Sequence, residues 1–186
     1  MTTNVLFIQG AGRGAHEEDR ALADGLQRAL GDDFRVLFPR MPGEDDPKPD
    51  TWKRAIALEA QHGKADIVVA HSAGGAMLAD LLAEGRSDVD LPRVRAAFLL
   101  APPYIGAEGW DFGGFHLDAL RERPQELDLS LSFYFGDADD TVPADHAALY
   151  RKVFPHAAFK RLPECDHQFD GHVENMAREI EAVARA

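Results

Sequence analysis

The 186-residue sequence contains a single cysteine, Cys165, so it can form neither an intramolecular disulfide nor a cysteine-rich metal site. It also lacks any apolar run near the roughly 20 residues that a helix needs to cross a bilayer. Residues 1–4 lack the basic segment and cleavage site of a signal peptide. We therefore expect a cytoplasmic protein that folds on its hydrophobic core alone and carries no metal ion or other cofactor.

Positive charge is also scarce in this chain. Its 20 Lys and Arg residues stand against 32 Asp and Glu, which gives a formal net charge of −12 at pH 7. Such an acidic surface repels nucleic acid and anionic lipid, so we expect neither a nucleic-acid partner nor a membrane partner. A small neutral or apolar substrate fits this charge better than an anionic one. The sequence sets no expectation for the oligomeric state.

Short apolar runs alternate with amphipathic segments along the whole chain. The runs predict strands at 5–9, 34–38, 66–70, 94–100, 131–135 and 158–162. Helices are predicted around Leu22 and Leu26, at 50–61, at 73–83, at 144–153 and after residue 172. In the first of these, Glu17, Glu18 and Asp19 lie in the first turn, where the helix dipole favours negative charge. This alternation predicts a single α/β domain over residues 1–186, a three-layer fold with a six-stranded, mostly parallel sheet and helices on both faces.

A tight strand-to-helix turn is predicted at Ser72. The expected strand ends at Ala70, His71 precedes the serine, and Ala73-Gly74 opens the next helix. Small residues on both sides of the serine are typical of a nucleophile elbow, which lifts the hydroxyl above the sheet edge. The alternative is that Ser72 only caps the helix. His71 adjoins the serine, but neighbouring side chains diverge on such a turn, so we take His71 as a candidate substrate contact.

A serine nucleophile needs a base and an orienting carboxylate. His167 follows the last predicted strand, and Asp137, Asp139 and Asp140 follow the strand before it. Carboxyl ends of parallel strands share one sheet edge, where ligands of such sheets bind, so these side chains are expected near Ser72. Residue by residue, a solvated histidine and a polar turn remain the alternatives. The ordered occurrence of serine, acid and histidine favours a catalytic triad.

The glycine-rich segment after the first strand is a candidate oxyanion loop. Its glycines allow close approach of a substrate, and the N–H groups of Ala11 and Ala73 are the expected oxyanion donors. The alternative is a dinucleotide-binding turn: Gly10 and Gly12 fit the string G-x-G-x-x-G only with Ala15 in place of the last glycine, a known variant that keeps this alternative open. However, the expected second strand has no clear acidic residue at its end to bind a ribose.

Several motifs together point to a known family. They are Gln9-Gly10-Ala11-Gly12, the loop from Met41-Pro42-Gly43 to Trp52, Ala70-His71-Ser72-Ala73-Gly74-Gly75, Ala101-Pro102-Pro103, Gly136-x-x-Asp139-x-x-Val142-Pro143 and Asp166-His167-Gln168-Phe169. Nearly the whole chain resembles the α/β-hydrolase superfamily, and within it the small serine hydrolases without a full cap domain, the retinoblastoma-binding-protein-9 and YdeN group. The resemblance implies that Asp139 is the triad acid, that His167 is the base and that the first strand lies between the second and third.

These observations predict a serine esterase that cleaves small ester or related acyl substrates through an acyl-enzyme. Candidate substrate contacts are Arg13, which could instead pair with Glu17, and the aromatic residues after the fourth strand. Those aromatics are Tyr104, Trp110, Phe112 and Phe115. They could equally pack a satellite core under a long loop. The alternative function is a hydrolase-like scaffold whose main role is to bind protein.

Overall fold

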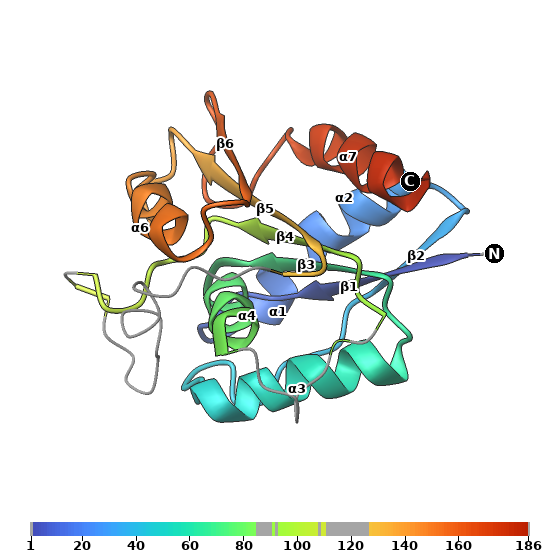
Figure 1. Cartoon of the computed structure of the whole chain (residues 1–186), viewed down its shortest axis with the longest axis horizontal. Coiled ribbons are helices and arrows are strands. Elements are labelled where there is room, and N and C mark those ends of the chain that lie inside the picture. The colour runs from blue at the N-terminus through green and yellow to red at the C-terminus, as the bar shows by residue number, and fades with distance from the viewer. Residues whose placement is uncertain (1, 85–90, 92, 108, 111–126, 186) are drawn as a thin grey trace.

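Six strands form one sheet in the computed structural model, which describes residues 2–84, 91, 93–107, 109–110 and 127–185 (Figure 1). The strands are β1 (Thr3–Ile8), β2 (Phe34–Leu37), β3 (Ile67–His71), β4 (Ala96–Leu100), β5 (Ser130–Gly136) and β6 (Ala158–Leu162). Their order is β2-β1-β3-β4-β5-β6, and each neighbouring pair is parallel. The sheet, expected to be mostly parallel, is thus parallel throughout, and β1 lies between β2 and β3 as the resemblance implied.

Helices cover both faces of this sheet and complete the predicted three layers (Figure 1). The described helices are α1 (Ala15–Glu18), α2 (Arg20–Leu30), α3 (Pro49–His62), α4 (Ser72–Glu84), α6 (His146–Val153) and α7 (Val173–Arg185). Helices α2 and α7 pack against each other, and α3 packs against α4. On β5, Phe133 contacts Tyr150 of α6, while Tyr134 donates a hydrogen bond to Glu179 of α7. Because successive strand residues face opposite sides, α6 and α7 cover different faces.

The apolar runs of the sequence become the buried centre of the sheet. Every residue of β3 and of β4 is buried, as expected for strands covered on both faces. The edge strand β6 is more exposed and carries Lys160 and Arg161, and charged side chains on an edge discourage pairing with another chain. The core therefore lies at the middle of the sheet, whose carboxyl ends bear the candidate site.

A buried ion pair joins the two helices α3 and α4. Lys53 Nζ donates to Asp80 Oδ2 at 2.8 Å and to Glu84 Oε1 at 2.6 Å. Burial alone would lower the pKa of Lys53, but these two carboxylates outweigh burial and leave the pKa above its ordinary value. The lysine is therefore charged, and its hydrogen bonds hold α3 and α4 together.

Asp19 departs from its expected place. It lies between α1 and α2, so the single helix predicted here is two helices, and Asp19 does not share a first turn with Glu17 and Glu18. Its side chain is only 3% exposed and accepts hydrogen bonds from Gly10 and His71. Glu17 and Glu18 do remain exposed in the first turn of α1. Asp19 is thus a buried acceptor for two donors, a role that the predicted first turn did not include.

The described residues add no cap domain to this core. Phe112 and Phe115, expected to contribute apolar surface near the site, lie outside the described residues. None of the helices that the structure describes is long and apolar enough to cross a membrane.

Candidate active site

Ser72 stands on the sharp turn that joins β3 to α4. Its backbone φ is +49°, in the left-handed region that residues other than glycine seldom adopt, which is the geometry of a strained elbow. A Cβ on Gly74 would overlap the carbonyl oxygen of Gln9 and lie 2.8 Å from Ile8 Cγ2. A Cβ on Gly75 would lie 3.1 Å from the carbonyl oxygen of Ala70. Small residues are therefore required because α4 starts directly against β1 and β3.

The structure brings Ser72, His167 and Asp139 together at the carboxyl edge of the sheet. Ser72 Oγ lies 3.0 Å from His167 Nε2, and His167 Nδ1 lies 2.9 Å from Asp139 Oδ2. A carboxylate can only accept, so Nδ1 carries the proton, and Nε2 is then free to accept the serine O–H. The three side chains form one continuous hydrogen-bonded line from carboxylate to hydroxyl.

The three acids that follow β5 have separate partners. Asp139 contacts His167, whereas Asp137 accepts the backbone N–H of Glu164 at 2.6 Å and Asp140 contacts the hydroxyl of Thr141. Asp139 is also the acid whose carboxylate is buried, with its side chain 1% exposed. The acid favoured by the family resemblance is thus the one beside the histidine.

Backbone donors hold the Asp139 carboxylate in its ionised form. Its Oδ1 accepts the N–H groups of Thr141 and Val142, each at 2.8 Å, while Oδ2 faces His167. Burial by itself would raise the pKa of Asp139, but the bond to His167 and the two amides outweigh it, so the pKa lies below its ordinary value. The carboxylate is therefore charged at neutral pH and can orient the imidazole.

Gly136 explains why the acid loop reaches the histidine loop. A Cβ at this position would overlap the carbonyl oxygen of Cys165 and lie 2.8 Å from its carbonyl carbon. That same carbonyl oxygen accepts the N–H of Ala138 at 3.0 Å. The end of β5 therefore touches the segment that leads into His167, and only glycine permits the approach.

Ala11 and Ala73 are the residues whose N–H groups were expected to bind an oxyanion. Ala73 lies in the first turn of α4, where N–H groups have no acceptor within the helix. On the other side of the serine, Gly10 N–H donates to Asp19 Oδ2 at 2.7 Å and Gly12 N–H donates to the carbonyl oxygen of Glu44 at 2.6 Å. The N–H groups of Gly10 and Gly12 are thus held by hydrogen bonds, which restrict the position of Ala11 between them.

Gln9 and Glu44 also support this loop; both lie within the family motifs named above, but neither was assigned a role of its own. Gln9 is fully buried; its amide nitrogen donates to Glu44 Oε2 at 2.8 Å, and its oxygen accepts the N–H of Met41. Glu44 further accepts the N–H groups of Gly14 and His16. A signal was present, because a polar Gln that ends a buried strand needs a partner. The partner itself, 35 residues away in a loop, had no signal.

His71 lies in the interior and not in a substrate-accessible position. It is 1% exposed, with Nδ1 2.9 Å from Asp19 Oδ1 and Nε2 2.8 Å from the carbonyl oxygen of His167. Both ring nitrogens are thus occupied by protein atoms. As the divergence of neighbouring side chains predicted, His71 does not reach the serine hydroxyl, and we do not retain it as a substrate contact.

The remaining expected substrate contacts lie in different environments. Tyr104 is fully buried against Tyr150, and its N–H donates to His146 Nδ1 at 2.8 Å, so it packs in the core. Trp110 is partly buried and meets the His146 ring edge-on. Arg13 is exposed on the loop after β1, while Glu17 forms ion pairs with Arg20 and Arg40. Trp110 and Arg13 remain candidates for the outer site.

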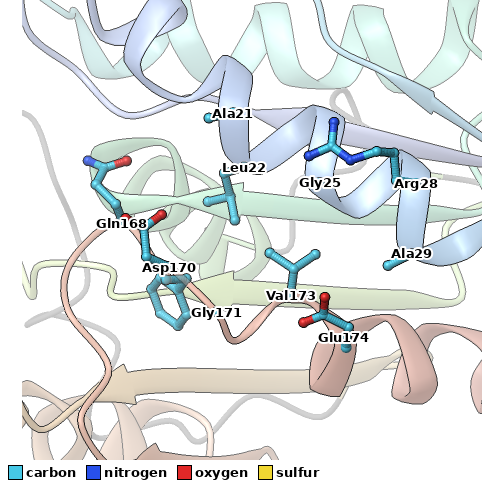
Figure 2. Close-up of a pocket in the computed structure, with 11 residues that line it drawn as sticks. Ala21, Leu22, Gly25, Arg28, Ala29, Gln168, Asp170, Gly171, Val173 and Glu174 are labelled. Atoms are coloured by element: carbon cyan, nitrogen blue, oxygen red, sulfur yellow. The ribbon is translucent and has the colours of Figure 1, made fainter.

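A groove of about 440 Å³ lies beside the histidine loop (Figure 2). It runs between α2 and the segment that leads into α7, with Leu22 and Val173 between the two. Gln168, which follows His167, and Asp170 stand at one end, and Arg28 stands toward the other. Neither Ser72 nor Asp139 lines this groove, so it flanks the site without containing the reacting groups.

Cys165 lies two residues before His167, but its thiol is not reactive. It is fully buried, and burial together with nearby carboxylates raises the pKa of its thiol to about 12. At neutral pH it is a thiol and a poor nucleophile. Within the described ranges of the chain, no group of three or more His, Cys, Asp or Glu side chains is placed to hold a metal ion.

The chain matches a protein-family model and several solved structures. A family model described as the alpha/beta hydrolase family matches residues 5–164. No curated protein matches the chain. Similar solved structures include the esterase domain of a Rhodothermus marinus protein, with a TM-score of 0.70 and 20% identity over 98% of this chain and 86% of that one.

Two further structures share the fold over nearly the whole chain. CarC, a serine hydrolase involved in carbazole degradation, has a TM-score of 0.72 and 15% identity, covering 98% of this chain and 91% of its own. Est1E from Butyrivibrio proteoclasticus with bound ferulic acid has a TM-score of 0.68 and 17% identity, covering 98% and 88%. At these identities the likeness is one of fold.

Proposed function

Since the chain belongs to the alpha/beta hydrolase family, we propose that it is a serine hydrolase that cleaves small esters through an acyl-enzyme. The observation that carries this proposal is the line of contacts from Ser72 Oγ through His167 to Asp139, at 3.0 Å and 2.9 Å. A serine hydroxyl is a weak nucleophile at neutral pH, and a hydrogen-bonded imidazole with an oriented tautomer activates it.

In the first half of the reaction, Ser72 Oγ attacks the acyl carbon while His167 Nε2 takes the hydroxyl proton. The N–H groups of Ala11 and Ala73 bind the oxyanion that develops on the carbonyl oxygen. His167 then gives its proton to the leaving alkoxide, and the alcohol departs. Asp139, ionised and buried, stabilises the imidazolium throughout.

In the second half, a water molecule replaces the alcohol. His167 takes a proton from the water as the water attacks the acyl carbon, and it returns that proton to Ser72 Oγ as the acid leaves. Each proton that His167 accepts is given back, so the site is restored after one turnover.

We base the proposed substrate class on charge and on an analogy of fold. The similar structures include an esterase domain and Est1E with bound ferulic acid, and an ester is proposed by analogy with the first of these. The net charge of −12 favours a neutral substrate. Trp110 and Arg13 are the outer residues proposed to contact it. Within the family, we propose the small hydrolases without a cap as the nearest group, because the described residues add no cap to the six-stranded core.

Hydrolysis of p-nitrophenyl acetate and butyrate tests the proposal. We expect saturable turnover by the unaltered protein and a loss in kcat of about 10⁶ in Ser72→Ala. Ser130→Ala is the matched control, because Ser130 is exposed at the start of β5 and its hydroxyl can be removed without touching the site. Equal turnover by Ser72→Ala and the unaltered protein would contradict the assignment of the nucleophile.

A further inference from the structure

A second aspartate–histidine pair lies immediately beside the Ser72–His167–Asp139 line. Asp19 and His71 are 2% and 1% exposed, and their side chains meet at 2.9 Å and 3.0 Å. The rings of His71 and His167 lie with their centroids 4.8 Å apart. The proposed chemistry does not use this buried pair, so the pair needs a separate explanation.

Both ring nitrogens of His71 face oxygen atoms. Nδ1 faces the Asp19 carboxylate, and Nε2 lies 2.8 Å from the backbone carbonyl oxygen of His167. A carbonyl oxygen accepts only, so Nε2 must carry a proton, and an ionised carboxylate requires a proton on Nδ1 as well. Burial would lower the pKa of His71, but the bond to Asp19 and the charge of Asp19 outweigh burial and leave the pKa above its ordinary value.

Through these contacts the pair joins three separate segments of the site. Asp19 Oδ2 accepts the N–H of Gly10 at 2.7 Å, which is the start of the expected oxyanion loop. His71 is the residue before Ser72 in the chain. His71 Nε2–H donates to the backbone of His167, 96 residues further on. The closeness of these segments is also evident at Gly10, where a Cβ would lie 3.2 Å from Ser72 Cβ.

We propose that Asp19 and His71 form a positioning pair, with His71 a doubly protonated imidazolium, that fixes the His167 loop and the oxyanion loop relative to Ser72. The proposal rests on the serine-hydrolase function proposed above. It assigns to Asp19 and His71 no contact with substrate. Their effect is exerted through the backbone of Gly10 and of His167, which carry or adjoin the reacting groups.

The expected size of the effect follows from how steeply catalysis depends on position. A displacement of about 1 Å at a reacting group can cost about 100-fold in rate. Without the bond from His71, the carbonyl of His167 loses a charge-assisted hydrogen bond. The imidazole of His167 is then held by only one of the two contacts that position it. The other contact, from His167 Nδ1 to Asp139, remains, so kcat falls but is not abolished.

Substitutions at the two positions separate positioning from simple stability. We expect His71→Phe and Asp19→Ala each to lower kcat for p-nitrophenyl butyrate 10- to 100-fold, with KM changed less than about threefold. Because the two residues act as one unit, the double variant is expected to be no slower than the slower single variant. Asp19→Asn keeps an acceptor for Gly10 and a donor for His71, so it is expected to restore most of kcat.

Lys53→Met is the matched control for destabilisation. It breaks another buried ion pair, to Asp80 and Glu84, which lie 8 and 12 residues along α4 from Ser72 and contact no reacting group. We expect it to lower Tm as much as the Asp19 and His71 variants do while kcat stays unchanged. If His71→Phe and Asp19→Ala fold and keep kcat within about twofold of the unaltered protein, the positioning role is wrong.

Histidine ¹⁵N NMR on the unaltered protein tests the same pair without reference to activity. Both ring nitrogens of His71 are expected to be protonated at pH 7.5, and Asp19→Asn is expected to leave only Nε2 protonated. An unprotonated His71 nitrogen at pH 7.5 would overturn the proposal even if every variant unfolds. Absence of ester turnover in the unaltered protein would instead contradict the proposed function. The NMR spectrum would then still show whether His71 beside Asp19 carries a proton on both ring nitrogens.

Discussion

Among single residues, the carboxylates that follow β5 illustrate how environment separates identical groups. Asp139 is buried, bonded to two backbone amides and to His167, and its pKa lies below the ordinary value. Asp137 is exposed and accepts the N–H of Glu164. The side chains are alike, but only one can orient the imidazole.

This difference predicts unequal effects of three conservative substitutions. Asp139→Asn keeps the shape but replaces an acceptor by a donor toward His167, which favours the wrong tautomer, so we expect kcat to fall about 10³- to 10⁴-fold. Asp137→Asn and Asp140→Asn are expected to stay within about threefold. Initial rates on p-nitrophenyl butyrate measure all three. Full activity in Asp139→Asn would move the role of the acid to a neighbouring carboxylate.

The sequence predicted the residues whose roles depend on local patterns. Ser72 follows a buried strand and precedes small helical residues, which is readable from a few neighbours. Asp19 was assigned to a helical first turn from its neighbours in the sequence, and nothing local indicates His71 as its partner 52 residues away. For Tyr104 the sequence left substrate contact and core packing open, because its burial depends on Tyr150 and His146 of α6, which come later in the chain.

At the level of helices and strands, glycines mark where two elements touch. Gly136 ends β5 against the backbone of Cys165, so any side chain there forces the two loops apart. Gly25 lies inside α2, and a Cβ there would meet Val173 at an ordinary 3.6 Å. The first glycine is required by contact, whereas the second only adds conformational freedom to the unfolded chain.

These two glycines therefore predict opposite outcomes on replacement by alanine. Gly136→Ala is expected to destabilise the fold by about 1–3 kcal/mol and to lower kcat, because the loops that carry Asp139 and His167 must separate. Gly25→Ala is expected to stabilise it by about 0.5–1 kcal/mol, a rise in Tm of about 1–4 °C. Thermal melts with parallel rate measurements check both. A neutral Gly136→Ala would refute the contact argument.

The order of elements was the most predictable feature of the fold. The predicted ends of β6 coincide with the observed Ala158–Leu162, and the other strands differ by a few residues at their ends. The exact break between α1 and α2 was not predictable, since it depends on where Asp19 finds its partners. Patterns of burial thus specify elements, and tertiary hydrogen bonds adjust their ends.

At the level of the whole molecule, the net charge of −12 acts on any charged substrate that approaches. The field is screened by salt, with a Debye length of about 30 Å at 0.01 M and about 3 Å at 1 M. A neutral ester does not feel this field, whereas an ester with a free carboxylate is repelled by it.

We therefore predict a difference in salt response between two esters of similar length. The kcat/KM for mono-p-nitrophenyl succinate is expected to rise as salt increases from about 0.01 to about 1 M, and that for p-nitrophenyl butyrate to stay nearly constant. Arg13→Ala, compared at each salt concentration, measures how far this exposed cation offsets the repulsion. Identical salt responses of the two esters would show that global charge does not influence substrate choice.

The central claim is that Ser72 is a nucleophile activated by His167 and held ready by Asp139. The most direct measurement is intact mass and peptide mapping after treatment with a fluorophosphonate, which reacts with activated serines. One adduct is expected, on Ser72, absent in Ser72→Ala and formed much more slowly in His167→Ala and Asp139→Asn. An adduct on another residue, or one that persists in Ser72→Ala, would contradict the account.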